Sequence, residues 1–186
     1  MKKYTLAIVA VALLSSLALG IGQQPGRERL GQIEESLKAD VPRILCLNES
    51  FATAGQPSDQ AYGKLAANGF RSVLNLRTAS EGIDLEKERS LVEKSGMRYI
   101  NIPVVSGAPQ SEQVDDFLKV VKNADNHPML IHCGSANRVG AFWMIYRVME
   151  QGWTEEKALE EATKIGLTSP GLKTFARNYV ASHKQK

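Results

Sequence analysis

One cysteine and one arginine in this sequence have the spacing of an anion-binding catalytic site. Residues 131–140 read IHCGSANRVG, so Cys133 ends an apolar run and Arg138 follows after four intervening residues. A thiolate is a strong nucleophile, and an arginine presents a planar, charged fork that matches a tetrahedral oxyanion. If the segment between them turns from a strand into a helix, its amides gather at the positive end of that helix. Cys133 and Arg138 are therefore the predicted catalytic pair.

The four residues between this pair suit a tight anion-binding loop. Gly134 and Ala136 are small enough for a sharp turn. The hydroxyl of Ser135 either orients the bound oxyanion or bonds only to its own backbone, and Asn137 is expected to fix the loop by side-chain-to-backbone bonds. We assign all four to substrate binding. The alternative is a buried structural cysteine beside a surface arginine, which the register of strand, loop and helix disfavours.

The elements that must position the loop follow an alternating pattern. Short apolar and β-branched runs predict strands at residues 43–47, 71–76, 98–104 and 128–132. Helical patterns lie between them at residues 58–68, 84–95 and 111–124, and after the loop at 138–151, 154–165 and 169–181. The predicted fold class is α/β, with a mainly parallel central sheet flanked by helices and an all-helical C-terminal third. Cys133 would lie at the carboxyl end of a strand, where such sheets bind ligands.

The first twenty residues have the pattern of an export signal. Lys2 and Lys3 precede an apolar run, and Ala18 and Gly20 are small residues at the spacing of a cleavage site. The run is shorter than the ~20 apolar residues of a spanning helix, which disfavours an uncleaved anchor. We expect a signal peptide at 1–20, a linker or N-terminal extension at 21–41, and a single catalytic domain at 42–186. The protein would be secreted across the inner membrane into the periplasm, with no stable membrane association after cleavage.

Composition and charge exclude several partner classes. The chain has 23 basic and 20 acidic residues and a formal charge of +3, of which Lys2 and Lys3 supply two charges. No nucleic-acid partner is expected from so weak a balance. The histidines lack the spacing of metal ligands, so neither a metal site nor a cofactor is expected. The two cysteines leave a disulfide between Cys46 and Cys133 open, although the apolar segment RILCLN favours a buried, inert thiol for Cys46.

His132, Cys133, Arg138 and Gly140 resemble the signature of the protein tyrosine phosphatase and dual-specificity phosphatase superfamily. The likeness extends to the small bacterial phosphatase-like domain that is also found fused in beta-lactamase-hydrolase-like proteins, through AGQPSD (54–59), GFRSVLNLR (69–77), YINIPV (99–104) and HCGSANRVGAFW (132–143). The resemblance implies a protein-tyrosine-phosphatase-like fold. For His132 it implies a hydrogen bond near the loop that tunes the thiolate, and the alternative is a core histidine with its own partners.

The sequence departs from the phosphatase pattern at three points. Phosphatases place five residues between the cysteine and the arginine, whereas rhodanese sulfurtransferases, on an unrelated fold, share the four found here. Val139 stands where phosphatases carry a Ser or Thr that helps the thiolate leave. The stretch 102–113 lacks the aspartate that acts as general acid, and its only acid is Glu112, at a predicted helix start where the helix dipole explains a carboxylate. Losing the acid should slow phosphomonoester hydrolysis roughly 100- to 10,000-fold.

These departures favour sulfur transfer. Thiosulfate expels sulfite without a proton donor, so Cys133 would become a persulfide and pass its outer sulfur to an acceptor thiol or cyanide. The expected partners are a small oxyanion substrate, thiosulfate or a phosphoester, and an acceptor thiol or reductant. One alternative is a protein tyrosine or dual-specificity-type phosphatase that acts through a phosphocysteine, with Glu112 as its possible acid. The second alternative is a non-catalytic module that binds phosphate or another anion.

Three further polar residues follow predicted strands or turns. Arg77 and Glu81 come after the strand at 71–76, which places them on the active-site side of the sheet, and we interpret them there as a surface ion pair. Gln56 belongs to the AGQP turn (54–57) and is the side chain there that can contact a substrate.

Overall fold

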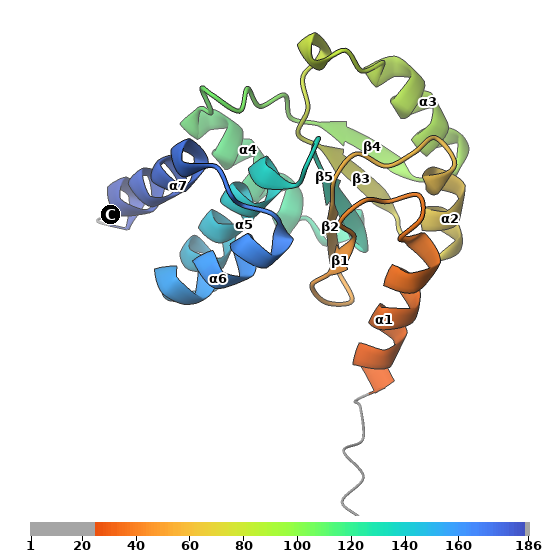
Figure 1. Cartoon of the computed structure of the whole chain (residues 1–186), viewed down its shortest axis with the longest axis horizontal. Helices are drawn as coiled ribbons and strands as arrows, with labels where there is room; N and C mark the ends of the chain where they lie inside the picture. Colours follow the sequence, from red (N-terminus) through yellow and green to blue (C-terminus); the bar gives the residue numbers. More distant parts are fainter. Residues whose placement is uncertain (1–24, 185–186) are drawn as a thin grey trace, which may run out of the picture.

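A five-stranded sheet divides the molecule (Figure 1), of which this computed structural model describes residues 25–184. The strands lie in the order β1-β2-β5-β3-β4. They are β1 (Leu45–Cys46), β2 (Phe51–Ala54), β3 (Ser72–Asn75), β4 (Arg98–Asn101) and β5 (Met129–His132). β1 runs antiparallel to β2, whereas the other three pairings are parallel. The predicted, mainly parallel α/β sheet is thereby confirmed.

Helices cover both faces of the sheet (Figure 1). One face carries α1 (Pro25–Leu37), α2 (Ala61–Ala67) and α3 (Leu85–Lys94). The other carries α4 (Ser111–Lys122), α5 (Asn137–Met149), α6 (Glu155–Ile165) and α7 (Pro170–His183). Two short 3₁₀ helices, η1 (Ala79–Glu81) and η2 (Ala124–Asn126), precede α3 and β5. The predicted all-helical C-terminal third is confirmed.

The alternation of side chains along each strand divides the core into two halves. In β5, Ile131 packs into the half that contains α4 to α7, whereas Leu130 packs into the half that contains α1 to α3. Both side chains are fully buried. Neighbouring strand residues point to opposite faces, so a sheet covered on both sides needs apolar residues at successive positions. This explains why the strands read as continuous apolar runs in the sequence.

One central strand escaped the sequence analysis. β2 consists of FATA, and half of its residues are alanines, which have a weak preference for strands. It nevertheless pairs along its whole length with β5, with Ala54 opposite His132. The tertiary pairing therefore overrides a weak local preference. The strands predicted at 43–47 and 98–104 are longer than the observed strands β1 and β4.

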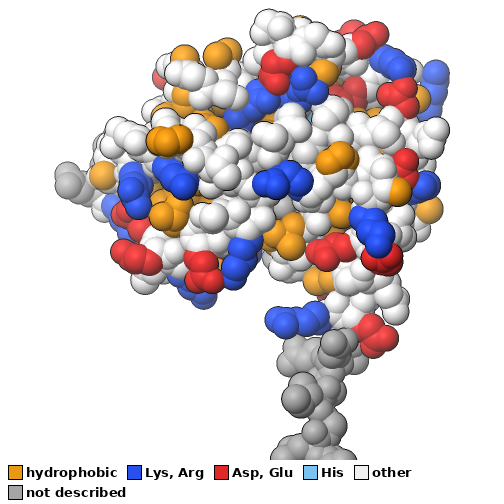
Figure 2. Space-filling model, viewed as in Figure 1, with side chains coloured by type: hydrophobic (Ala, Val, Ile, Leu, Met, Phe, Trp, Pro, Cys, Tyr) orange, Lys and Arg blue, Asp and Glu red, His pale blue; other side chains and the backbone are white. Residues whose placement is uncertain are grey.

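The N-terminal predictions divide at the start of α1. The predicted signal peptide, residues 1–20, lies outside the described residues. The segment expected as a linker contains α1, and Leu37 and Val41 are fully buried against the sheet. None of the helices in residues 25–184 is long and apolar enough to cross a membrane. On the face drawn in Figure 2, acidic and basic side chains are interspersed.

Both cysteines carry free thiols. Cys46 is half-buried, and burial, together with the nearby carboxylate of Glu34, raises the pKa of its thiol to about 12. Cys46 is thus a protonated, unreactive thiol at neutral pH, as the apolar segment around it predicts.

The helix that follows Cys133 is enclosed by protein on all sides. Arg138 to Val148 are buried throughout, and α5 packs against both α6 and α7. Gly140 permits this packing, because a Cβ atom there would lie 2.8 Å from the Ala162 carbonyl oxygen and 2.8 Å from Leu167 Cβ. Such distances are far inside van der Waals contact, so the loop between α6 and α7 approaches the backbone of α5 directly.

We expect Gly140→Ala to destabilise the fold by about 1–3 kcal/mol, because α6 and Leu167 would have to move away from α5. Gly63→Ala is the matched control: Gly63 lies in α2 with nothing within 4 Å of its Cβ position, so alanine should stabilise by up to ~1 kcal/mol. Urea unfolding of the two variants measures both effects. A Gly140→Ala protein as stable as the wild type would contradict the close packing.

Candidate active site at the carboxyl edge of the sheet

The carboxyl ends of four parallel strands meet at one edge of the sheet. His132 at the end of β5 lies opposite Ala54 of β2 and Asn75 of β3, and Asn75 lies opposite Asn101 of β4. The residues that follow these strands are therefore neighbours. They are Gly55 and Gln56 after β2, Leu76 and Arg77 after β3, Ile102 to Val104 after β4, and Cys133 after β5. This is the edge at which parallel sheets bind ligands.

Cys133 begins a short loop that leads directly into α5. Its side chain is only 1% exposed, and α5 begins four residues later at Asn137. Ala136 adopts a left-handed conformation (φ 64°), which turns the chain into the helix. Among residues 25–184, the backbone amides of residues 134–138 have no protein acceptor. The loop therefore offers unpaired donors at the positive end of a helix, the arrangement that binds anions.

Arg138 is fixed by several acceptors around its guanidinium group. Nη1 donates to Glu81 Oε1 (2.6 Å), to the Val104 carbonyl (2.7 Å) and to the Leu76 carbonyl (3.1 Å), and Nη2 donates to Glu81 Oε2 (2.8 Å). A guanidinium carries five N–H groups, so the Nε hydrogen and one Nη2 hydrogen remain for an oxyanion. Burial lowers the pKa of Arg138, but its contacts with Glu81 and Cys133 outweigh burial and raise the pKa above its usual value. Arg138 therefore stays charged.

Glu81 fixes the guanidinium group of Arg138. Its carboxylate binds Arg138 at both oxygens and also accepts from Arg77 Nε at 3.0 Å. The hydrogen bond from Arg138 lowers the pKa of Glu81 to about 2, so the carboxylate is ionised at neutral pH. The expected ion pair between Arg77 and Glu81 is present, but its interpretation as a mere surface pair was wrong. The pair extends to Arg138 and fixes the predicted catalytic arginine.

A buried carboxylate lies behind the nucleophile. Glu88 of α3 is 6% exposed, and it accepts hydrogen bonds from Tyr62, Gln56, Asn75 and Tyr99. Its Oε1 also lies 3.1 Å from Nε2 of His132. Burial alone raises the pKa of Glu88, but its contacts with His132, Tyr62 and Gln56 outweigh burial and lower the pKa to about 2. His132 thus lies beside a charged partner and next to Cys133.

Gln56 connects the two acidic residues. Its Oε1 accepts from Arg77 Nη1 at 2.9 Å, and its Nε2 donates to Glu88 Oε1 at 3.0 Å. A continuous series of polar contacts therefore runs from Arg138 through Glu81, Arg77, Gln56 and Glu88 to His132. The prediction that Gln56 contacts a substrate remains a prediction, and in this structure its side chain bonds to Arg77 and Glu88.

The remaining predicted site residues have different surroundings. Gly134 and Ser135 are exposed, and the Gly134 carbonyl accepts from the Gln56 amide at 3.3 Å. The side chain of Asn137 accepts from the amides of Thr168 (2.8 Å) and Ser169 (2.9 Å), so it ties the loop to the start of α7, as expected of a structural role. Glu112 lies exposed in the first turn of α4, and among the described residues no contact joins it to Cys133 or Arg138.

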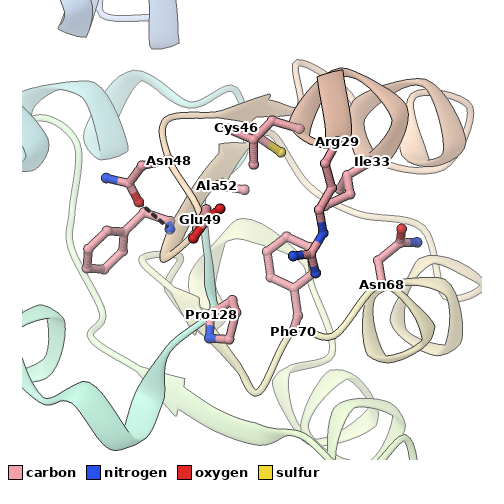
Figure 3. A pocket seen from close by; sticks show the side chains of 11 residues that line it. Arg29, Ile33, Cys46, Asn48, Glu49, Ala52, Asn68, Phe70 and Pro128 are labelled. Carbon is pink, nitrogen blue, oxygen red and sulfur yellow. Dashed lines mark hydrogen bonds between the residues drawn. The ribbon is translucent and has the colours of Figure 1, made fainter. Parts of the chain in front are cut away.

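A separate cavity of about 210 Å³ lies under α1 (Figure 3). Phe51, Phe70 and Pro128 line it, and each of them is at or just before the start of a parallel strand. Arg29 and Glu49 add charges to its wall. The cavity is therefore at the amino ends of the strands, at the edge of the sheet opposite Cys133. It is not part of the nucleophile site.

The sequence analysis missed the roles of Glu81 and Glu88. A signal for Glu81 existed, because it follows the end of a strand that is parallel to the nucleophile strand and must reach the same edge. No such signal exists for Glu88. It occupies the predicted helix at 84–95, which is rich in charged residues, and only the packing of α2, β3, β4 and β5 buries it.

We expect Glu81→Gln to weaken the binding of orthophosphate roughly 10-fold, because a carboxamide cannot accept from both Nη1 and Nη2 and the fork loses its fixed plane. Calorimetric titration of the purified protein measures this. Glu86→Gln is the control, since Glu86 is exposed and contacts only Arg89 at the surface. Unchanged or tighter phosphate binding by Glu81→Gln would contradict the role of Glu81 as a support for Arg138.

Glu88 should make stability depend on acid pH. Its pKa is about 2 in the folded protein against a reference of 4.5, so its ionised form stabilises the fold above pH 4.5 and this contribution is lost as the pH falls toward 2. The loss should reach on the order of 3 kcal/mol. Urea unfolding across this range should give a flatter profile for Glu88→Gln than for the wild type or for Glu93→Gln, an exposed position on the same helix. Parallel profiles of stability against pH for all three proteins would contradict the predicted contribution of Glu88.

Comparisons with known proteins agree with this geometry. A family model described as "DSP-PTPase phosphatase fused to NAD+ Kinase" matches residues 38–178. A beta-lactamase hydrolase-like protein of Xylella fastidiosa (strain 9a5c) is 25% identical over 111 residues, which are 58% of this chain and 26% of that protein. The dual specificity protein phosphatase TpbA of Pseudomonas aeruginosa (strain UCBPP-PA14) is 29% identical over 83 residues, which are 44% of this chain and 38% of TpbA. The chain thus spans only a quarter to two fifths of these relatives.

Solved structures have the same fold. A putative phosphatase (DUF442) from Shewanella putrefaciens CN-32 matches with a TM-score of 0.68 and 24% identity, over 81% of this chain and 98% of that one. The crystal structure of P. aeruginosa TpbA matches with a TM-score of 0.61 and 22% identity, over 76% and 84% of the two chains. The protein-tyrosine-phosphatase-like fold is thereby confirmed. With the family match over residues 38–178, the chain belongs to the family of dual-specificity-type phosphatase domains that is described as fused to NAD+ kinase.

Proposed function

We propose that this chain is a cysteine-dependent phosphatase. The observation that carries the proposal is the position of the Arg138 guanidinium. Its Nη1 and Nη2 atoms donate to Glu81, whereas the Nε hydrogen and one Nη2 hydrogen of Arg138 stay available beside Cys133. The unpaired amides of residues 134–138 supply further donors. Together they form a site for a tetrahedral oxyanion directly over a nucleophile.

The reaction has two steps on Cys133. The thiolate attacks phosphorus, the sulfur–phosphorus bond forms, and the bond to the leaving oxygen breaks with its electron pair. Water then attacks the phosphocysteine, the sulfur leaves as a thiolate, and orthophosphate is released with a proton. Arg138 and the loop amides hold the equatorial oxygens through both steps, where negative charge accumulates.

The leaving group limits the choice of substrate. Glu81 cannot act as the general acid, because its pKa of about 2 keeps it ionised and both of its oxygens are bound to arginines. Glu112 remains the candidate named from the sequence, on the exposed first turn of α4. Without a close proton donor, we expect aryl phosphates and other esters of weakly basic leaving groups to react far faster than alkyl phosphates.

The relatives support phosphate chemistry better than the sulfur transfer favoured by the sequence. The family model carries a phosphatase name, and so does TpbA, the dual specificity protein phosphatase of P. aeruginosa. Sulfur transfer remains the second candidate because of one specific observation: four residues, not five, separate Cys133 from Arg138. In that reaction Cys133 would take the sulfane sulfur of thiosulfate, expel sulfite, and pass the sulfur to an acceptor thiol.

The test compares both reactions in one preparation. The reduced protein, freed of excess reductant, is given p-nitrophenyl phosphate in one assay and thiosulfate with cyanide in another. We expect phosphate release that disappears in Cys133→Ser and persists in Cys46→Ser, because burial and Glu34 keep Cys46 a protonated thiol. Thiocyanate formation that depends on Cys133, with no phosphate release, would overturn the proposal in favour of sulfur transfer.

A further inference from the structure

Arg43 lies at the rim of the Cys133 loop in an unusual backbone conformation. Its φ is 58°, in the left-handed region that residues other than glycine rarely adopt. The preceding carbonyl, of Pro42, accepts from the Gly55 amide at 2.8 Å. A Cβ atom on Gly55 would lie 3.3 Å from that carbonyl oxygen and 3.1 Å from the Gly134 carbonyl oxygen. The segment that carries Arg43 is therefore packed against the nucleophile loop through Gly55.

The side chain of Arg43 comes close to the same loop at Gly166. A Cβ atom on Gly166 would lie 3.3 Å from Arg43 Nε, 3.1 Å from the Ser135 carbonyl oxygen and 3.2 Å from Ala136 Cβ. The guanidinium of Arg43 and the Ser135–Ala136 part of the loop thus meet at Gly166. Ser135 is an exposed residue of this part of the loop.

Arg43 differs from the other two arginines near the loop. Arg77 and Arg138 share the carboxylate of Glu81. Arg43 is exposed, and no carboxylate among residues 25–184 forms an ion pair with it. An uncompensated guanidinium beside an anion site adds binding for a second anionic group, and its planar fork suits phosphate.

The missing general acid points to the same class of substrate. Breaking an alkyl phosphate ester expels a strongly basic alkoxide that needs a proton, whereas breaking a phosphoanhydride expels a phosphate, which is weakly basic and leaves as an anion. The stretch 102–113 has no aspartate, and Glu81 is ionised and bound to two arginines. A substrate whose leaving group is a phosphate would therefore react without the aspartate that is absent from this stretch.

We propose that Arg43 and the Ser135 hydroxyl form a second anion subsite, and that the substrate carries a diphosphate. This inference rests on the proposed phosphatase function. Cys133 attacks the terminal phosphorus, the sulfur–phosphorus bond forms, and the anhydride bond breaks with its electron pair on the bridging oxygen. Arg43 holds the departing phosphate. Water then hydrolyses the phosphocysteine and restores the thiolate, with release of orthophosphate and a proton.

The test uses two substrates, inorganic pyrophosphate and p-nitrophenyl phosphate, with a metal chelator present to suppress contaminating metal-dependent pyrophosphatases. Steady-state rates are measured for the wild type, Arg43→Gln, Arg43→Lys and Arg71→Gln. Arg71 is the control, because it is exposed just before β3, at the edge of the sheet opposite Cys133. We expect the wild type to hydrolyse pyrophosphate in a Cys133-dependent reaction.

Arg43→Gln should raise the ratio of the pyrophosphate KM to the p-nitrophenyl phosphate KM by roughly 10- to 100-fold, the value of one charge-assisted contact. Arg43→Lys should recover part of the loss, and Arg71→Gln should leave the ratio unchanged. Hydrolysis of p-nitrophenyl phosphate with no change of the ratio in Arg43→Gln would overturn the subsite and leave the phosphatase function standing. Absence of Cys133-dependent hydrolysis of both substrates would overturn both.

Discussion

The double contact between Glu81 and Arg138 is the interaction on which the proposed anion site depends. An arginine side chain has many rotamers, and an oxyanion site needs one of them. Glu81 and the carbonyls of Leu76 and Val104 select that rotamer by occupying one end of the guanidinium. The other end is left for the ligand. The cost of burying the charge of Arg138 is offset within the protein, so the guanidinium is held in one position without a ligand.

The sheet topology makes this arrangement possible. Four parallel strands end at one edge, and the residues that follow them come from segments far apart in the chain. His132, Gln56, Arg77 and Glu81 reach the nucleophile loop in this way, and Glu88 of α3 joins them from the face of the sheet. The series of polar contacts begins at Arg138, which follows Cys133 in the sequence, and ends at His132, which precedes it. The buried carboxylate of Glu88 has several polar partners and thereby connects α3 with α2 and with three strands.

The sequence predicted most of the fold and pointed to Cys133 and Arg138 as the centre of the proposed site. The strand, loop and helix around Cys133 were legible because periodicity, small residues and the cysteine–arginine spacing agree at one place. β2 could not be predicted, since the segment FATA owes its extended form to pairing with β5. The role of Glu81 depends on a contact across 57 residues, and that of Glu88 on burial among several elements. The end of a strand places Glu81 at this edge, but its pairing with Arg138 and the burial of Glu88 arise from tertiary packing, which local patterns do not encode.

The most direct test of the central claim is the chemical identity of the intermediate on Cys133. The reduced protein is mixed with p-nitrophenyl phosphate or, separately, with thiosulfate, quenched by denaturant within the first turnover, and examined by mass spectrometry of the intact chain and its peptides. The account predicts a phosphoryl group on Cys133, absent from Cys46, after the phosphate ester. A single added sulfur atom on Cys133 after thiosulfate, with no phosphoryl adduct from the ester, would contradict it.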